Sequence, residues 1–68
     1  RMNLGDYLKQ ERPEKYFVLK IHNWGIENLT DFAAHFLRWT VTNVEIVQEC
    51  NSEGKIETIH NIYIGDWE

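Results

Sequence analysis

The chain has little of what secreted, membrane and nucleic-acid-binding proteins need. Cys50 is the single cysteine among 68 residues, whereas small secreted domains carry even sets of cysteines for disulfide bonds. No apolar run approaches the ~18 residues of a membrane span, and no secretory leader is recognisable. These absences predict a cytoplasmic protein in a reducing compartment, without a membrane span.

Basic residues are scarce in the second half of the chain. After Arg38, Lys55 is the one basic residue, whereas Glu45, Glu49, Glu53, Glu57, Asp66 and Glu68 are acidic. Phosphate binding needs a clustered basic surface, so we expect no direct contact with nucleic acid. The acidic half is instead expected to attract a basic protein partner by electrostatic steering.

Catalytic and metal-binding motifs are missing as well. His22, His35, His60 and Cys50 are scattered, with no Cys-x-x-Cys or His-x-x-x-His spacing. The glycines are isolated, so no phosphate-cradling loop is present, and there is no serine nucleophile elbow. We expect no catalytic, cofactor-binding or metal-binding residue and no enzyme activity; an enzyme would need a site formed between subunits.

The composition is that of one small globular domain over residues 1–68, with Arg1 interpreted as a cloning remnant before Met2. Hydrophobic residues make up 43% and charged residues 26%, which argues against disorder. A chain of this size buries only ~60% of its unfolded surface, so its stability margin is thin.

Local signals predict the first elements. Asn3 is a good N-cap for a helix over about 4–11, which must end before Pro13. Alternation over 16–22 predicts a strand, followed by a turn at Asn23-Trp24-Gly25. Alternate side chains of this strand point to opposite faces. The side chains of Phe17, Leu19 and Ile21 are expected to face the core, and the opposite face carries those of Tyr16, Val18, Lys20 and His22.

Helical spacing over 29–40 predicts an amphipathic helix whose apolar face is Leu29, Phe32, Ala33, Phe36, Leu37 and Thr40. The β-branched residues Thr40, Val41 and Thr42 are expected to end it.

Two further strands, over 42–50 and 55–64, form a predicted hairpin. We expect a three-residue loop, Ser52-Glu53-Gly54, with Gly54 in the left-handed conformation. In the resulting register, the residue numbers of each cross-strand pair add up to 106. The inner-face pairs are then Cys50 with Ile56, Gln48 with Thr58, Ile46 with His60, Val44 with Ile62, and Thr42 with Ile64. His60 is expected to be a buried, hydrogen-bonded histidine of this face.

The elements together predict an α+β fold: a short N-terminal helix, then β-α-β-β, with one amphipathic helix packed on one face of a small, mainly antiparallel sheet. The strand order stays open, and the first strand can join the sheet beside the last.

The other face of the hairpin carries the candidate functional residues. Val47 and Ile59 form an apolar pair ringed by Glu45, Glu49 and Glu57, and Glu49 directly faces Glu57, which costs free energy. Either this cost marks a functional surface, or twist and solvent separate the two carboxylates. With two aromatic anchors, the predicted partner-binding residues are Glu45, Val47, Glu49, Glu57, Ile59, Tyr63 and Trp67.

Two hypotheses follow. The first is a small acidic protein-binding module that inhibits or regulates a basic or nucleic-acid-binding protein, comparable to phage-encoded inhibitors in size and charge only. The second is a homodimer with a structural or regulatory role, joined through Val18, Val47, Ile59 and Tyr63, which would offset the thin stability margin. Neither requires a cofactor.

Overall fold

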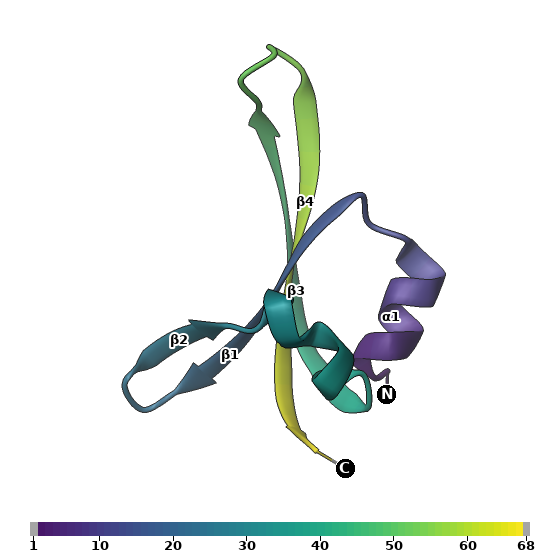
Figure 1. The fold of residues 1–68 in the computed structure, drawn as a ribbon, viewed down its shortest axis with the longest axis vertical. Helices are drawn as coiled ribbons and strands as arrows, with labels where there is room; N and C mark the ends of the chain where they lie inside the picture. The colour runs from purple at the N-terminus through teal and green to yellow at the C-terminus, as the bar shows by residue number, and fades with distance from the viewer. Residues whose placement is uncertain (1, 68) are drawn as a thin grey trace.

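The computed structural model describes residues 2–67, with side chains as far as Gly65. Its elements are α1 (Leu4–Glu11), β1 (Lys15–His22), β2 (Gly25–Asn28), the 3₁₀ helix η1 (Thr30–Phe36), β3 (Trp39–Cys50) and β4 (Ile56–Trp67). The sheet has the strand order β2-β1-β4-β3 (Figure 1). β1 runs parallel to β4, and the other two pairs are antiparallel. The α+β class is confirmed, and the sheet is mixed, with one strand more than predicted.

The first helix begins and ends where local signals indicate. The Asn3 side chain accepts a hydrogen bond from the backbone N–H of Asp6 at 2.8 Å, which satisfies one of the free donors of the first turn. At the other end Arg12 takes a left-handed conformation (φ 47°), and Pro13 follows. The predicted range of 4–11 is confirmed.

Replacing Asn3 with alanine is expected to lower the free energy of unfolding by about 1 kcal/mol, because the Asp6 N–H loses its partner. Urea denaturation followed by circular dichroism measures the change. Gln10→Ala, an exposed substitution in the same helix, is the control and should change stability by less than about 0.5 kcal/mol. Equal losses in the two variants would contradict a capping role for Asn3.

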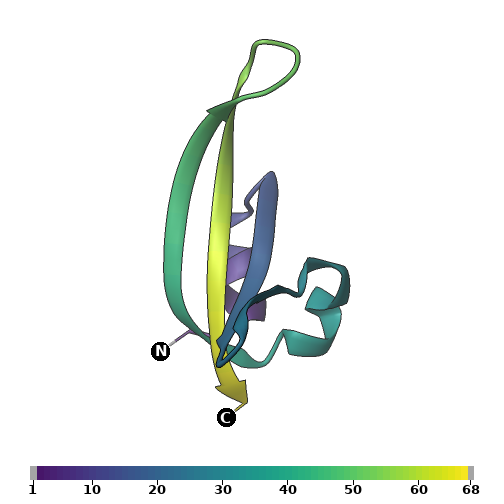
Figure 2. The same cartoon turned by 90° about the vertical axis from the view of Figure 1, so that its left-hand side faces the viewer.

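The core lies on one face of the sheet, which we call the inner face. It is marked by Val18 of β1 and Ile62 of β4, which pair in register and are both fully buried. Figure 2 shows α1 and η1 to the same side of β3 and β4. The buried cluster beneath them comprises Leu4, Tyr7, Val18, Leu29, Ala33, Ile62 and Ile64.

The predicted orientation of the first strand is wrong. Val18 is fully buried on the inner face, whereas Ile21, assigned to the core, is 66% exposed. A period of two separates the two sets of side chains but does not say which set meets the helices. Both sets of β1 contain apolar residues, since Tyr16 and Val18 share their face with Lys20 and His22, and the parallel pairing of Val18 with Ile62 decided which set is buried.

The predicted helix over 29–40 is also wrong. Only Thr30–Phe36 is helical, with 3₁₀ geometry and a kink at Phe32, and β3 already begins at Trp39. The segment is held by β1, since the Val18 N–H donates to Thr30 Oγ1 (2.9 Å) and the Leu29 N–H donates to the Val18 carbonyl (2.6 Å). These tertiary hydrogen bonds, together with the β preference of residues 39–42, outweigh the helical spacing of the apolar residues over 29–40.

β2 was not predicted. It forms a hairpin with β1 across the two residues Asn23 and Trp24, where His22 pairs with Gly25. The predicted turn is therefore correct, and Gly25 supplies its unusual φ of 142°. Four residues are too few for alternation to reveal a strand.

The predicted hairpin register is confirmed from Asn43 to Cys50. The loop is as expected, with Gly54 left-handed (φ 79°) and the Asn51 N–H donating to the Lys55 carbonyl at 2.8 Å. The predicted pair of Thr42 with Ile64 is wrong, because a bulge places Val41 opposite Ile64. The bulge lets both Val41 and Val44 pack against the core.

Candidate functional site

No helix of the described chain covers the second face of the sheet, which we call the outer face. Its centre is Ile59 of β4, which lies between Lys15 of β1 and Val47 of β3. Ile59 is only 5% exposed and stands apart from the buried cluster of the inner face. Side chains of the neighbouring strands therefore close over it, and Phe17, Leu19, Val47 and Tyr63 surround it half-buried.

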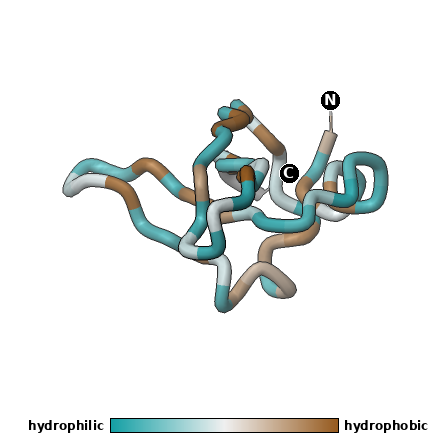
Figure 3. Tube along the Cα trace, turned by 90° about the horizontal axis from the view of Figure 1, so that it is seen from above, coloured by the Kyte–Doolittle hydropathy of each residue, from teal (hydrophilic) through white to brown (hydrophobic). Residues whose placement is uncertain are grey.

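The apolar row continues onto the β1–β2 hairpin, which projects away from the body of the fold (Figures 1 and 3). Ile21 and Ile26 face each other across the two strands and are 66% and 60% exposed. Trp24 in the turn is 90% exposed. Large contiguous apolar patches on a protein surface usually mark sites where another molecule binds.

The acidic side chains of the outer face flank the Val47–Ile59 pair, with Glu45 on one side and Glu49 and Glu57 on the other, and Glu49 stands directly opposite Glu57 as predicted. Glu57 accepts hydrogen bonds from Asn51 Nδ2 (3.0 Å) and Lys15 Nζ (3.2 Å). These two bonds, that of Asn51 first, hold the pKa of the Glu57 carboxyl below its usual value. Local partners therefore offset the repulsion between the two carboxylates.

The remaining carboxylates differ in how firmly they are held. Glu45 accepts a long hydrogen bond from Asn61 Nδ2 (3.3 Å). The side chain of Glu49 has neither a hydrogen bond nor an ion pair with the described side chains of residues 2–65. Two exposed glutamates at the β3 edge of the outer face are thus available to a partner.

Removing the amide of Asn51 is expected to raise the pKa of Glu57, because its hydrogen bond is the largest single cause of the depression. Lys15→Ala is expected to raise this pKa as well, because Lys15 contributes both a hydrogen bond and a positive charge. A carboxyl whose pKa is lowered by folding stabilises the fold above its unfolded pKa and loses that contribution as the pH falls. NMR titration of the Glu57 side-chain carboxyl in wild type, Asn51→Ala and Lys15→Ala measures the three values. An unshifted pKa in the wild type would contradict the assignment.

The structure brings six of the seven predicted partner-binding residues to the outer face: Glu45, Val47, Glu49, Glu57, Ile59 and Tyr63. The backbone of Trp67 pairs with Trp39, and its side chain lies outside the described part of the chain. Val18, proposed for self-association, belongs to the inner core instead. Sequence reasoning missed Phe17 and Leu19, whose alternation carried the signal but was assigned to the core.

His60 lies on the inner face, where its Nδ1 and the Tyr7 hydroxyl share a hydrogen bond and the two rings meet edge-on. The predicted hydrogen bond of His60 is confirmed, but its side chain is only partly buried. Burial raises the pKa of the Tyr7 phenol, and the nearby Glu11 carboxylate adds to the effect. This hydrogen bond connects α1 to β4, so we assign the pair a structural role.

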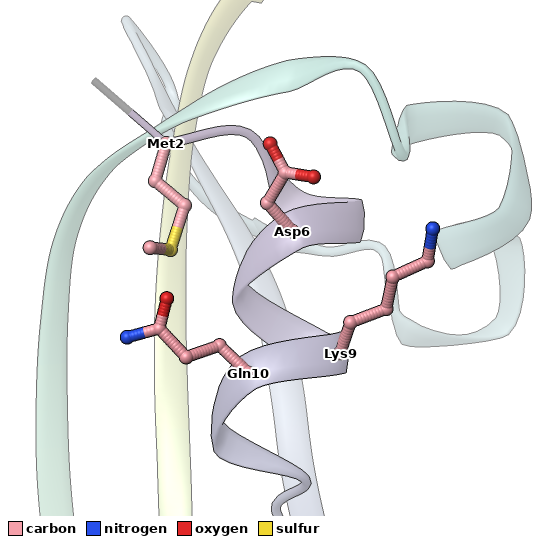
Figure 4. A pocket seen from close by; sticks show the side chains of 4 residues that line it. All are labelled: Met2, Asp6, Lys9 and Gln10. Carbon is pink, nitrogen blue, oxygen red and sulfur yellow. The ribbon is translucent and has the colours of Figure 1, made fainter.

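One hollow lies elsewhere, beside α1. It has a volume of about 490 Å³ and is lined by Met2, Asp6, Lys9 and Gln10 (Figure 4). A second hollow, of about 360 Å³, lies where Lys15 and Glu57 meet the β3–β4 loop. Among the described side chains no three His, Cys, Asp or Glu residues come together as a metal site, and no described helix is long and apolar enough to span a membrane.

These features define the class of the protein as a small α+β domain with one helix-covered and one open sheet face. The chain was compared with models of protein families, with curated proteins and with solved structures, and none of them matches it.

Proposed function

We propose that this chain is a small protein-binding module that inhibits or regulates its partner, and that the outer face is its contact surface. The observation that carries the proposal is the apolar row of the outer face, which no helix covers, with Glu45 on one side of the Val47–Ile59 pair and Glu49 and Glu57 on the other. Folding gains nothing from leaving such a row uncovered, whereas a partner that covers it gains the free energy of apolar burial.

The chemistry of the partner follows from the charges. Glu45, Glu49 and Glu57 outnumber the lysines of this region, Lys15 and Lys55, which both line the hollow beside Glu57, and Lys15 is already paired with Glu57. A partner with lysine or arginine side chains around an apolar patch complements this arrangement. A nucleic-acid-binding protein presents such a surface, and occupation of its phosphate-binding residues would inhibit it.

The roles of the residues divide by position. Val47 and Tyr63, which lie half-buried around the already buried Ile59, supply the apolar centre from which a partner excludes water, and most of the binding energy is expected there. Glu45 and Glu49 lie toward the edge, where charges chiefly raise the association rate. This division predicts that binding weakens with salt but is not abolished by it.

The test compares two double variants with the same change in net charge. Glu45→Lys with Glu49→Lys alters the outer face, whereas Glu11→Lys with Glu27→Lys alters exposed positions on α1 and β2. Each domain is immobilised, host-cell lysate is passed over it, and retained proteins are identified by mass spectrometry and then bound in purified form. We expect one basic partner that binds wild type and control alike and the outer-face variant at least 10-fold more weakly.

Two outcomes contradict the proposal. Equal weakening by both double variants would mean that net charge alone attracts the partner and that the outer face is not its site. Failure of the wild type to retain any protein selectively would remove the binding-module function.

A further inference from the structure

β3 is the edge strand of the sheet, and most of that edge is open. Its beginning is covered by the N-terminal segment, since Thr40 bridges to Asn3 and the Val41 N–H donates to the Met2 carbonyl at 2.9 Å. Beyond the bulge, from Asn43 to Cys50, the strand order leaves β3 with β4 as its one neighbour. Unpaired backbone groups in a row are a template for another strand.

The outward backbone groups can be assigned. The Asn51 N–H donates to the Lys55 carbonyl, so Asn51 turns its backbone groups toward β4. Antiparallel ladders alternate between residues that turn to one neighbour and residues that turn to the other. Val44, Ile46 and Gln48 therefore direct their N–H and C=O groups to the open edge.

This edge lacks the strongest protections against pairing and carries only the charges of Glu45 and Glu49. Natural edge strands are protected by charged side chains, lysine above all, and by proline or a bulge where they are exposed. Residues 43–50 contain neither lysine nor proline, and the bulge lies before them, at the covered end. Ile46 at the middle of the open edge is 59% exposed.

The isolated chain also exposes more surface than a typical monomeric protein of the same mass. Its accessible surface is 5125 Å², whereas a monomeric protein of 8.2 kDa exposes about 4500 Å². Its radius of gyration is 12.5 Å, against about 11 Å for a compact domain of this length. The excess, about 600 Å², approaches the roughly 800 Å² that each partner contributes to a standard interface.

We propose that β3 pairs with β3 of a second copy of this chain, antiparallel and about a two-fold axis at Ile46, so that the two sheets become one continuous sheet. This inference is independent of the proposed function, because it uses the edge of the sheet and leaves both outer faces open on the same side. The dimer covers Ile46 and pairs the outward groups of Val44 with those of Gln48.

The charges select this register. An axis at Glu45 places that glutamate opposite itself, and an axis at Val47 places Glu45 opposite Glu49, which are both repulsive arrangements. With the axis at Ile46, Glu45 faces Val47 and Glu49 faces Asn43. This axis also lies near the middle of the open edge, so the paired segment is the longest available.

Sedimentation equilibrium of Ile46→Lys against Ile56→Lys tests the dimer. Both residues are exposed (59% and 67%) and face the inner side of the same hairpin, but Ile56 lies on β4, away from the edge. We expect a dimer for wild type and Ile56→Lys, and at least a 10-fold higher dissociation constant for Ile46→Lys. A monomeric wild type at high micromolar concentration, or equal effects of the two lysines, would overturn the proposal.

Cross-linking tests the register. In a Cys50→Ser background, Ile46→Cys places two thiols on residues that pair with themselves, about 5.5 Å apart between Cα atoms, within disulfide range. Gln48→Cys lies on the same edge, but its counterpart is displaced by about 14 Å along the strands. Mild oxidation should link Ile46→Cys and not Gln48→Cys. Equal cross-linking of the Ile46→Cys and Gln48→Cys variants would overturn the two-fold axis at Ile46. This result does not depend on whether a partner protein is found in the lysate experiment.

Discussion

Ile62→Ala is expected to lower the free energy of unfolding by about 2–5 kcal/mol, the largest effect of a single substitution in this chain. Ile62 is fully buried in β4, where it pairs with Val18 on one side and Val44 on the other. Truncation removes apolar contact and leaves a cavity beneath α1. Because a 68-residue domain has a total stability of only about 3–10 kcal/mol, the variant should be partly or wholly unfolded at 37 °C.

Ile56→Ala is the matched control. It makes the same chemical change on the same face of the same strand, at a position that is 67% exposed. Its expected effect is below about 0.5 kcal/mol. Urea denaturation of both variants, followed by tryptophan fluorescence, measures the difference, and a loss below about 1 kcal/mol in Ile62→Ala would contradict the placement of the core.

Gly65→Ala is expected to cost about 1–3 kcal/mol, because the added methyl group overpacks the bulge between β3 and β4. A Cβ atom at Gly65 would lie 2.8 Å from Cγ2 of Thr42. The Thr42 hydroxyl donates to the Tyr63 carbonyl at 3.2 Å, which holds that side chain in its present rotamer. Thr42 therefore cannot turn its methyl group aside without losing this hydrogen bond.

A double-mutant cycle isolates the contact. Thr42→Ser removes Cγ2 and keeps the hydroxyl, so Gly65→Ala should cost markedly less in the Thr42→Ser background than in the wild type. Thermal or urea unfolding of the four proteins gives the coupling energy. Strict additivity of the two substitutions would show that Gly65 is required for a reason other than its distance from Thr42.

The parts of the fold that were predicted correctly depend on neighbours in the sequence. The N-cap Asn3 and the stop before Pro13 fixed α1, because capping and the restrictions of proline act within a few residues. The β3–β4 register followed from Gly54, which accepts a left-handed φ, and from the need to place one apolar set on one face. The bulge at Thr42 escaped prediction because its cause is the packing of Val41 and Val44 against the same core.

The parts that were predicted wrongly depend on distant partners. Residues 29–40 have a helical period, but the backbone of Val18 binds Leu29 and Thr30. Both faces of β1 contain apolar residues, so the parallel pairing with β4 decided that Val18 would be buried. The same reversal placed the half-buried Phe17 and Leu19 on the outer face and enlarged the candidate site beyond the residues chosen from the hairpin.

The sequence by itself determined the α+β class, the first helix, the last hairpin with its register, and the acidic residues that flank Val47 and Ile59. These features arise from local backbone preferences and from one strong apolar alternation. The tertiary structure alone decided the strand order, the burial of Val18, the 3₁₀ segment and the open outer face. The physical reason is that a periodic pattern states how side chains divide between two faces, whereas which face is covered depends on where α1 and β4 come to lie.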